Sequence, residues 1–257
     1  MALLTKQEEI AALRTSGIIT AEALQMVVDA VRPGVRTADL NVIAEKYIRN
    51  HGATPAFLGY QGYPAALCVS VNDEVVHGIP SGDRVIEEGD VVSVDLGSVY
   101  QGMYSDHART VVAGKPAPAV KKLLADTDEA LNVGLKTIHD GSHVGDIGAA
   151  IQNYLEPRGY GVIRQLCGHG VGKAVHEPPE IPNVGRRGSG AILRTGMVIA
   201  VEPMVTLGDW HVDTLEDGWT VVTADHSLAA HSEHTVIVTP RGCEIITPIP
   251  HGKHSRA

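Results

Sequence analysis

The segment GDVVSVD at residues 89–95 recurs as GMVIAVE at residues 196–202, and this repeat decides the fold. Each copy opens with glycine, continues as an apolar strand-like run and ends on an acid. The same offset, 107 residues from position 89 to position 196, also superimposes Gly34 on Gly141, Asp39 on Asp146, Leu40 on Ile147 and Tyr47 on Tyr154. One offset that holds across helices and strands predicts two similar halves sharing one core. The alternative is coincidence in a chain rich in both elements.

The hydrophobic pattern predicts two helices followed by strands in each half. In the first half we expect helices over residues 5–31 and 37–50 and strands over 65–71, 90–96 and 108–114. In the second half we expect helices over 117–138 and 144–159 and strands over 196–205, 219–223 and 234–239. Thr5 with Glu8 predicts a capping box, and Thr37 predicts an N-cap. The fold class is therefore α+β, with antiparallel sheets backed by helices and a cleft between the halves.

The composition is that of an ordinary globular protein, with 44% apolar and 20% charged residues. A formal net charge of −9 argues against nucleic acid as a main partner. The chain lacks an apolar run of about 18 residues, the length needed to span a membrane. Its start, MALLTKQEEI, lacks the features of a secretory signal, and its three cysteines form no CxxC pair. We therefore expect a cytoplasmic protein with reduced thiols.

Acidic residues end the two matching strands. Asp95 and Glu202 each close a buried apolar run, where a carboxylate is unfavourable unless it is paired or binds a cation. The stretch DLGSVYQGMYSD at 95–106 predicts a hairpin that turns around Tyr100 and Gln101 and sets Asp95 opposite Asp106, with Cβ atoms about 5 Å apart. A solvated strand end or a salt bridge is the alternative for any one acid. Two facing carboxylates need a counterion, so the pattern favours a metal.

The segment GHGVGKAVHEPP at 168–179 carries two histidines among glycines and prolines. These residues exclude a helix, so His169 and His176 must lie on extended or looped backbone. Glu233, just before HTVIV, supplies a fourth acid. Four carboxylates and one imidazole suit two divalent cations such as Mn, Fe or Co. Two such ions about 3.5–4 Å apart activate water and polarise a carbonyl, which is the chemistry of hydrolysis.

The order of these motifs resembles that of the type I methionine aminopeptidases of the pita-bread fold, over residues 5–246. The motifs are HGIP with His77, VDLG with Asp95, ARTV after Asp106, GHGVGKAVHEPP with His169 and His176, VEP with Glu202, and EHT with Glu233. The resemblance implies a single catalytic metallopeptidase domain over residues 1–257. Its halves would span about residues 5–114 and 115–246, followed by a flexible tail at 247–257.

The resemblance also implies roles for individual residues. The metal ligands would be Asp95, Asp106, His169, Glu202 and Glu233, with Asp106 and Glu233 bridging two ions of Co, Mn, Fe, Zn or Ni. His77 would bind the scissile amide region and His176 the carbonyl or its oxyanion, while Glu202 would relay a proton to the leaving amine. The pocket for the methionine side chain would be lined by Phe57, Tyr60, Tyr63, Cys68 and Trp219. Plain structural roles are the alternatives for the two histidines and the pocket residues.

The sequence departs from the family pattern at two places. Val175 stands where many relatives carry phenylalanine, and His231 and Ser232 stand where glutamine and an aromatic residue are common. We expect both departures to reshape the pocket. The histidines outside the motifs, His231 among them, are interpreted as surface or structural residues.

The resemblance implies that the substrate is the N-terminal methionine of nascent polypeptides and peptides. We expect a monomer without nucleic-acid specificity, and a transient contact with the ribosome stays open. Two alternatives remain: a prolyl (Xaa-Pro) peptidase of the same fold, or a non-catalytic binding protein on that scaffold. Prolyl peptidases usually carry an extra N-terminal domain, whereas the first helix here starts near Thr5. Non-catalytic relatives typically lose metal ligands, and all five positions are filled here.

Overall fold

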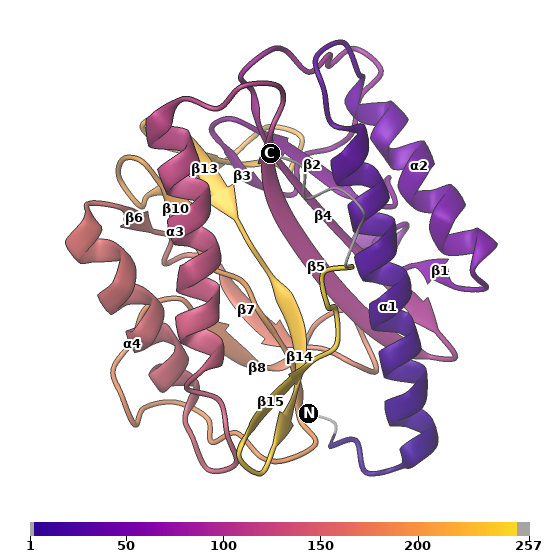
Figure 1. The fold of residues 1–257 in the computed structure, drawn as a ribbon, viewed down its shortest axis with the longest axis vertical. Helices are drawn as coiled ribbons and strands as arrows, with labels where there is room; N and C mark the ends of the chain where they lie inside the picture. The colour runs from indigo at the N-terminus through magenta and orange to yellow at the C-terminus, as the bar shows by residue number, and fades with distance from the viewer. Residues whose placement is uncertain (1–2, 251–257) are drawn as a thin grey trace.

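Two pairs of helices flank the central strands in the structure, a computed structural model that describes residues 3–250 (Figure 1). The first pair is α1 (Gln7–Ala30) and α2 (Thr37–Asn50), and the second is α3 (Pro118–Leu135) and α4 (Val144–Leu155). An offset of 107 residues carries the first residue of α2 onto the first residue of α4. No helix within residues 3–250 combines the length and apolar character needed to cross a membrane.

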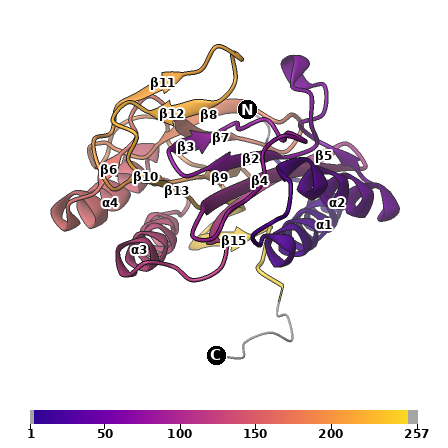
Figure 2. The same ribbon diagram turned by 90° about the horizontal axis from the view of Figure 1, so that it is seen from above.

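Antiparallel sheets lie across one side of the two helix pairs, as the view from above shows (Figure 2). The four-stranded sheet contains β1 (Thr54–Pro55), β2 (Cys68–Val71), β4 (Val91–Tyr100) and β5 (Met103–Val112), with β4 pairing the other three. The five-stranded sheet has the order β15 (Gly242–Ile245), β14 (His234–Thr239), β9 (Val198–Val201), β7 (Cys167–Gly170) and β8 (Glu177–Pro182). The expected α+β fold is confirmed.

Two three-stranded sheets and two short 3₁₀ helices complete the described structure. One sheet has the order β13 (Ala229–His231), β10 (Met204–Thr206) and β6 (Gly161–Val162), and the other β11 (Val212–Thr214), β12 (Val221–Thr223) and β3 (Glu74–Val76). The 3₁₀ helices are η1 (Tyr60–Gly62) and η2 (Glu156–Arg158). The strands over 65–71, 90–96, 108–114, 196–205, 219–223 and 234–239 were expected in roughly the right places. The strands β1, β3, β6, β7, β8, β11, β13 and β15 were not predicted.

Helix α1 packs on the β4–β5 hairpin partly through buried hydroxyl groups. Ser16 and Thr20 of α1 each lie within 3.2 Å of the hydroxyls of Ser98 and Ser105, and all four side chains are buried. The hydroxyls satisfy one another, so this polar contact avoids the penalty of unpaired buried groups. The next residue after Ser16, Gly17, allows close approach of the C-terminal segment, because a Cβ there would lie 2.0 Å from the Ile246 carbonyl oxygen.

The helix ends differ from the expected caps. The N-cap of α1 is Lys6, which makes no side-chain cap bond, so the predicted Thr5–Glu8 capping box is wrong. Thr37 is the first residue of α2 rather than its N-cap, and its hydroxyl bonds the backbone of Ser81 instead. The expected tail at 247–257 also starts too early, because Thr247 is fully buried. Residues 251–257 of that prediction lie outside the described residues.

The β4–β5 hairpin turns at Gln101 and Gly102, both with positive φ, one residue later than expected. In the resulting register Asp106 pairs with Gly97 and Asp95 with Ala108. The two acids are therefore diagonal neighbours rather than directly opposite. They still share one face of the sheet, and the charge of Asp106 contributes to the raised pKa of Asp95.

A seam between β5 and β14 joins the two halves. The Thr235 hydroxyl accepts from the backbone N–H of Asp106 at 2.8 Å and donates to its carbonyl at 2.8 Å. Two residues away along each strand, the Glu233 N–H donates to the Ala108 carbonyl at 3.0 Å. These bonds fix the backbone on both sides of Asp106 and Glu233, which come from different halves.

Candidate metal centre

A cavity of about 330 Å³ is lined by strands and loops of both halves. All residues given a site role by sequence analysis line it, namely Phe57, Tyr60, Tyr63, Cys68, His77, Asp95, Asp106, His169, His176, Glu202, Trp219 and Glu233. The lining also includes Val76, Gln165, Leu166, Cys167, Val175 and Met204. Residues separated by more than half of the chain therefore face one hollow.

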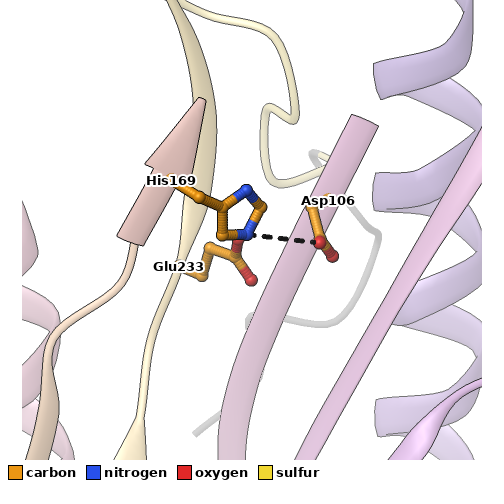
Figure 3. Close-up of side chains that lie close together, drawn as sticks. All are labelled: Asp106, His169 and Glu233. Atoms are coloured by element: carbon orange, nitrogen blue, oxygen red, sulfur yellow. Dashed lines mark ion pairs between the residues drawn. The ribbon is translucent and has the colours of Figure 1, made fainter. Parts of the chain in front are cut away.

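The acids and the imidazole at the base of the cavity come from five different strand positions. Asp95 lies in β4, Asp106 in β5 and His169 in β7, while Glu202 directly follows β9 and Glu233 directly precedes β14. Figure 3 shows Asp106, His169 and Glu233 pointing toward one another. One donor atom of each of these three lies within 4.8 Å of the others. A single cation could contact all three.

The four carboxyl groups are held in an environment that disfavours their charge. Burial, reinforced by the neighbouring acids, raises the pKa of Asp106 to about 7 and the pKa values of Asp95 and Glu233 well above their usual range. Burial raises the pKa of Glu202 to about 8. No described residue lining the cavity is a lysine or arginine that could neutralise them. Within residues 3–250, one oxygen of Asp95 and one of Glu233 also lack a hydrogen-bond partner.

These observations fit divalent cations. Orphaned buried carboxylate oxygens, mutual repulsion and the absence of a cationic side chain among the lining residues are all relieved when a metal ion binds. The donor set is mostly oxygen, which suits Mn, Fe or Co better than the cysteine-rich sites of structural zinc.

His169 is arranged to present a lone pair to the acids. Its Nδ1 lies 3.0 Å from the Gly170 carbonyl, so Nδ1 carries the proton and donates it there. Its Nε2 then faces Glu202 Oε1 at 3.5 Å. The same nitrogen lies 3.9 Å from Asp106 Oδ2 (Figure 3). Burial lowers the pKa of His169 to about 3, so the ring is neutral at pH 7. A neutral imidazole with a free Nε2 is the form that binds metals.

His176 and His77 lie at the cavity without such contacts to the acids. Nδ1 of His176 is 2.9 Å from the Tyr60 hydroxyl, and the His176 ring stands edge-on to His169 with centroids 4.2 Å apart. His77 follows β3 with φ of 61°, an uncommon conformation outside glycine, and its ring meets Trp219 edge-on at 6.4 Å. Burial lowers the pKa of His77 to about 4 and also lowers that of His176. Both rings are therefore neutral hydrogen-bonding groups.

An apolar pocket adjoins the acids. Its walls are Phe57, Tyr60, Tyr63, Cys68, Val175 and Trp219, and Ala56 and Ala65 pack against them from outside the cavity lining. The Tyr63 hydroxyl contacts the carbonyls of Leu67 and Gly78 at 3.2 and 3.0 Å, and its ring meets Trp219 edge-on at 5.1 Å. These contacts hold the pocket walls in place. An apolar side chain could enter the pocket while its polar atoms face the acids.

The second departure from the family pattern lies behind the acids rather than in the pocket. Neither His231 nor Ser232 is among the residues lining the described cavity. The Ser232 hydroxyl contacts Asp128 at 2.5 Å, whereas the His231 ring lies 3.4 Å from Glu202 and is 1% exposed. The expectation that both departures shape the pocket is therefore wrong for His231 and Ser232. Val175 does line the cavity, as expected, and its effect on the shape of the pocket stays a prediction. The sequence signal for this position was that His231 stands two residues before the expected ligand Glu233 in AHSEHT.

Comparison with known proteins gives a consistent result. Residues 11–240 match the model of metallopeptidase family M24. A methionine aminopeptidase of Clostridium perfringens is 46% identical over 249 residues, which cover 97% of this chain and 100% of that protein. The crystal structure of the Thermotoga maritima methionine aminopeptidase superposes with a TM-score of 0.94 at 45% identity, over 96% of this chain and 99% of that one. A Xaa-Pro dipeptidase of Bacillus anthracis reaches 0.79 at 27% identity, over 97% of this chain but 63% of that one.

Proposed function

The chain belongs to metallopeptidase family M24, and on that premise we propose that it hydrolyses the N-terminal methionine from peptides and newly made proteins. The observation that carries this proposal is one cavity in which a buried acid cluster adjoins apolar side chains. Neither half holds a complete site, because Asp95 and Asp106 precede residue 115 and the other expected ligands follow it. We therefore treat the two halves as one catalytic domain.

We assign the centre to two divalent cations. The residues that would hold the ions are Asp95, Asp106, His169, Glu202 and Glu233, and of these Asp106 and Glu233 would serve both. Four buried carboxylates support two dications better than one, since a single dication would leave a net negative charge in the cavity. Bound there, the ions would supply Lewis acidity for the scissile carbonyl and lower the pKa of water. The oxygen-rich donor set favours Mn, Fe or Co, with Zn and Ni as further candidates.

The side chains around the centre divide the remaining work. We propose that Glu202 accepts a proton from the attacking water and returns it to the leaving amine, because it lies at the cavity and its pKa is raised toward neutrality. His176, oriented by the Tyr60 hydroxyl, donates a hydrogen bond to the carbonyl oxygen as negative charge develops on it. His77 hydrogen-bonds the amide that is cut.

The pocket explains a preference for methionine at the first position. Its walls, Phe57, Tyr60, Tyr63, Cys68, Val175 and Trp219, are mostly apolar, so a long unbranched apolar side chain gains burial there without leaving a polar group unpaired. The free α-amino group of a substrate would lie near a cation held by the acids beside the pocket. A chain with no free amino group at that point loses this interaction, which limits cleavage to the first peptide bond.

The experiment that tests the proposal compares two peptides. The protein loaded with Mn²⁺ should release methionine from Met-Ala-Ser and leave an Ala-Pro peptide intact. Release of alanine without methionine would instead identify a prolyl peptidase, the class represented by the Bacillus anthracis relative. A protein that bound no divalent cation and cleaved neither peptide would favour the non-catalytic alternative.

The setting of the reaction follows from the substrate. Initiator methionine is exposed where chains are synthesised, so we propose that the protein works in the cytoplasm on nascent chains, as a monomer. A transient contact with the ribosome would bring the cavity close to emerging N-termini. Sedimentation of the protein with ribosomes at low and physiological salt tests that contact.

A further inference from the structure

His231 is a buried residue to which the proposed reaction gives no role. It ends β13, and its backbone is fixed by one hydroxyl: Thr110 Oγ1 donates to the His231 carbonyl and accepts from its N–H, both at 2.8 Å. The side chain is 1% exposed. Within residues 3–250, neither Nδ1 nor Nε2 has a hydrogen-bond partner that meets normal geometry. Two unpaired nitrogens on one buried ring are unfavourable unless something in the working protein satisfies them.

The ring is aimed at one oxygen of Glu202. His231 Nε2 lies 3.4 Å from Glu202 Oε2, whereas His169 Nε2 lies 3.5 Å from Oε1 of the same carboxylate. Glu202 is thus placed between two imidazoles, one at each oxygen. Asp106 is also close enough to act electrostatically on His231.

The two imidazoles must differ in the position of their proton. The Nδ1–H of His169 is committed to the Gly170 carbonyl, so its Nε2 offers a lone pair. The His231 ring carries an N–H on at least one of its two nitrogens. Placing it on Nε2 directs a donor at the carboxylate, whereas placing it on Nδ1 would set two lone pairs, on Nε2 and Oε2, against each other.

We propose that His231 is a positioning residue that donates its Nε2–H to Glu202 Oε2 and so holds Oε1 toward His169 and the cations. Carboxylates and histidines that bind metals are commonly held by such a hydrogen bond from outside the ligand set. The rigid backbone clamp by Thr110 keeps the donor in place. The inference rests on the proposed function only in that Glu202 must be a ligand.

Metal affinity of matched variants tests the proposal. His231→Leu removes the donor, and His231→Gln keeps an N–H donor at the same number of bonds from the backbone. We expect His231→Leu to weaken Mn²⁺ binding about 10- to 100-fold, the usual effect of losing such a partner, and His231→Gln to restore most of it. His226→Leu, an exposed and remote substitution, serves as the control. Mn²⁺ titration against a competing chelator measures the affinity, and the Co²⁺ absorption spectrum reports the coordination.

Two results would overturn the proposal: wild-type affinity in His231→Leu, or equal loss in His231→Leu and His231→Gln with a changed Co²⁺ spectrum, which would make the imidazole itself a ligand. Failure of the wild-type protein to bind Mn²⁺ would instead overturn the metal centre.

A second measurement needs no substitution and so does not depend on the variants folding. Long-range ¹H–¹⁵N correlation spectra of the Zn²⁺-loaded wild-type protein report which ring nitrogen of each histidine carries the proton. We expect the Nε2–H form for His231 and the Nδ1–H form for His169. An Nδ1–H form for His231, with Nε2 shifted as in a metal-bound ring, would contradict the donor role.

Discussion

The buried carboxyl group of Asp106 is unfavourable for folding but favourable for metal binding. It is buried, its pKa is raised by burial and by neighbouring acids, and its backbone is fixed by Thr235. The residue is thus unfavourable for the stability of the metal-free fold. A side chain kept in such a place indicates a function that requires its charge.

Replacing Asp106 by asparagine separates these two effects. Asp106→Asn preserves the shape of the side chain but removes one buried carboxyl group and a proposed ligand of both cations. We therefore expect Mn²⁺ affinity and kcat to fall more than about 100-fold, which is beyond the effect of losing a residue outside the ligand set. The metal-free variant should unfold at a temperature no lower than wild type, since repulsion in the cluster is reduced. Chelator titration, peptide assays and thermal unfolding with and without Mn²⁺ check these outcomes. A large drop in the metal-free unfolding temperature would contradict the electrostatic account.

His176 should affect catalysis without affecting metal binding. His176→Ala removes a donor expected to meet the developing oxyanion, so kcat should fall about 100- to 1,000-fold. Metal content, measured by inductively coupled plasma mass spectrometry, should stay at the wild-type value because the ring makes no contact with the acids. Tyr60→Phe, which removes only the bond to Nδ1 of His176, should give a smaller drop. Loss of metal in His176→Ala would show that the ring is a ligand.

At the scale of elements, the helices were predictable and several strands were not. The helices α1 to α4 were expected within a few residues because their apolar periodicity is strong over 12 or more residues. The strands β7, β8 and β13 carry glycine, proline or histidine, and their pairing comes from distant partners rather than local preference. The hairpin register failed for a local reason, because Gln101 adopts a positive φ that its residue type does not signal.

Close packing of α1 against the C-terminal segment gives a test of element packing. In Gly17→Ala the new methyl would lie 2.0 Å from the carbonyl oxygen of Ile246, which is backbone and must shift. We expect a loss of about 1–3 kcal/mol in the free energy of unfolding, the usual range for overpacking. The matched control is Gly134→Ala in α3, where the nearest atoms are side-chain atoms of Ile151 at 3.1 Å and helix propensity improves. Urea denaturation of both variants compares them, and equal stabilities would contradict the packing argument.

At the scale of the whole molecule, the repeat and the residues that line the cavity could be inferred from sequence, but the surroundings of the acids could not. The repeat placed Asp95 and Glu202 at equivalent strand ends, and the motif order supplied Asp106, His169 and Glu233. The position of His231 behind Glu202 depends on how β13 packs beside both halves. No pattern within one segment encodes that packing.

Metal binding should couple the stability of the whole molecule to pH. In the metal-free protein Asp106 and Glu202 have raised pKa values of about 7 and 8, so between about pH 4 and pH 8 the fold retains protons that the unfolded chain releases. Its free energy of unfolding therefore falls as pH rises through this window. Bound cations favour the ionised carboxylates and remove this fall. We expect the rise in unfolding temperature caused by Mn²⁺ to be larger at pH 8 than at pH 5.5, as calorimetry at both values can show. An equal rise at both values would contradict the coupling.

The seam between β5 and β14 has an evolutionary consequence. Asp106 and Glu233 belong to opposite repeats, and Thr235 of the later repeat fixes the backbone of the acid in the earlier one. A gene encoding one repeat alone would give an inert product unless two copies paired across this boundary. Once fused, the repeats can drift apart in their helices, but a change at the boundary in one alters the other. Substitutions at these few positions are therefore expected to occur together, although more than a hundred residues separate the positions in the chain.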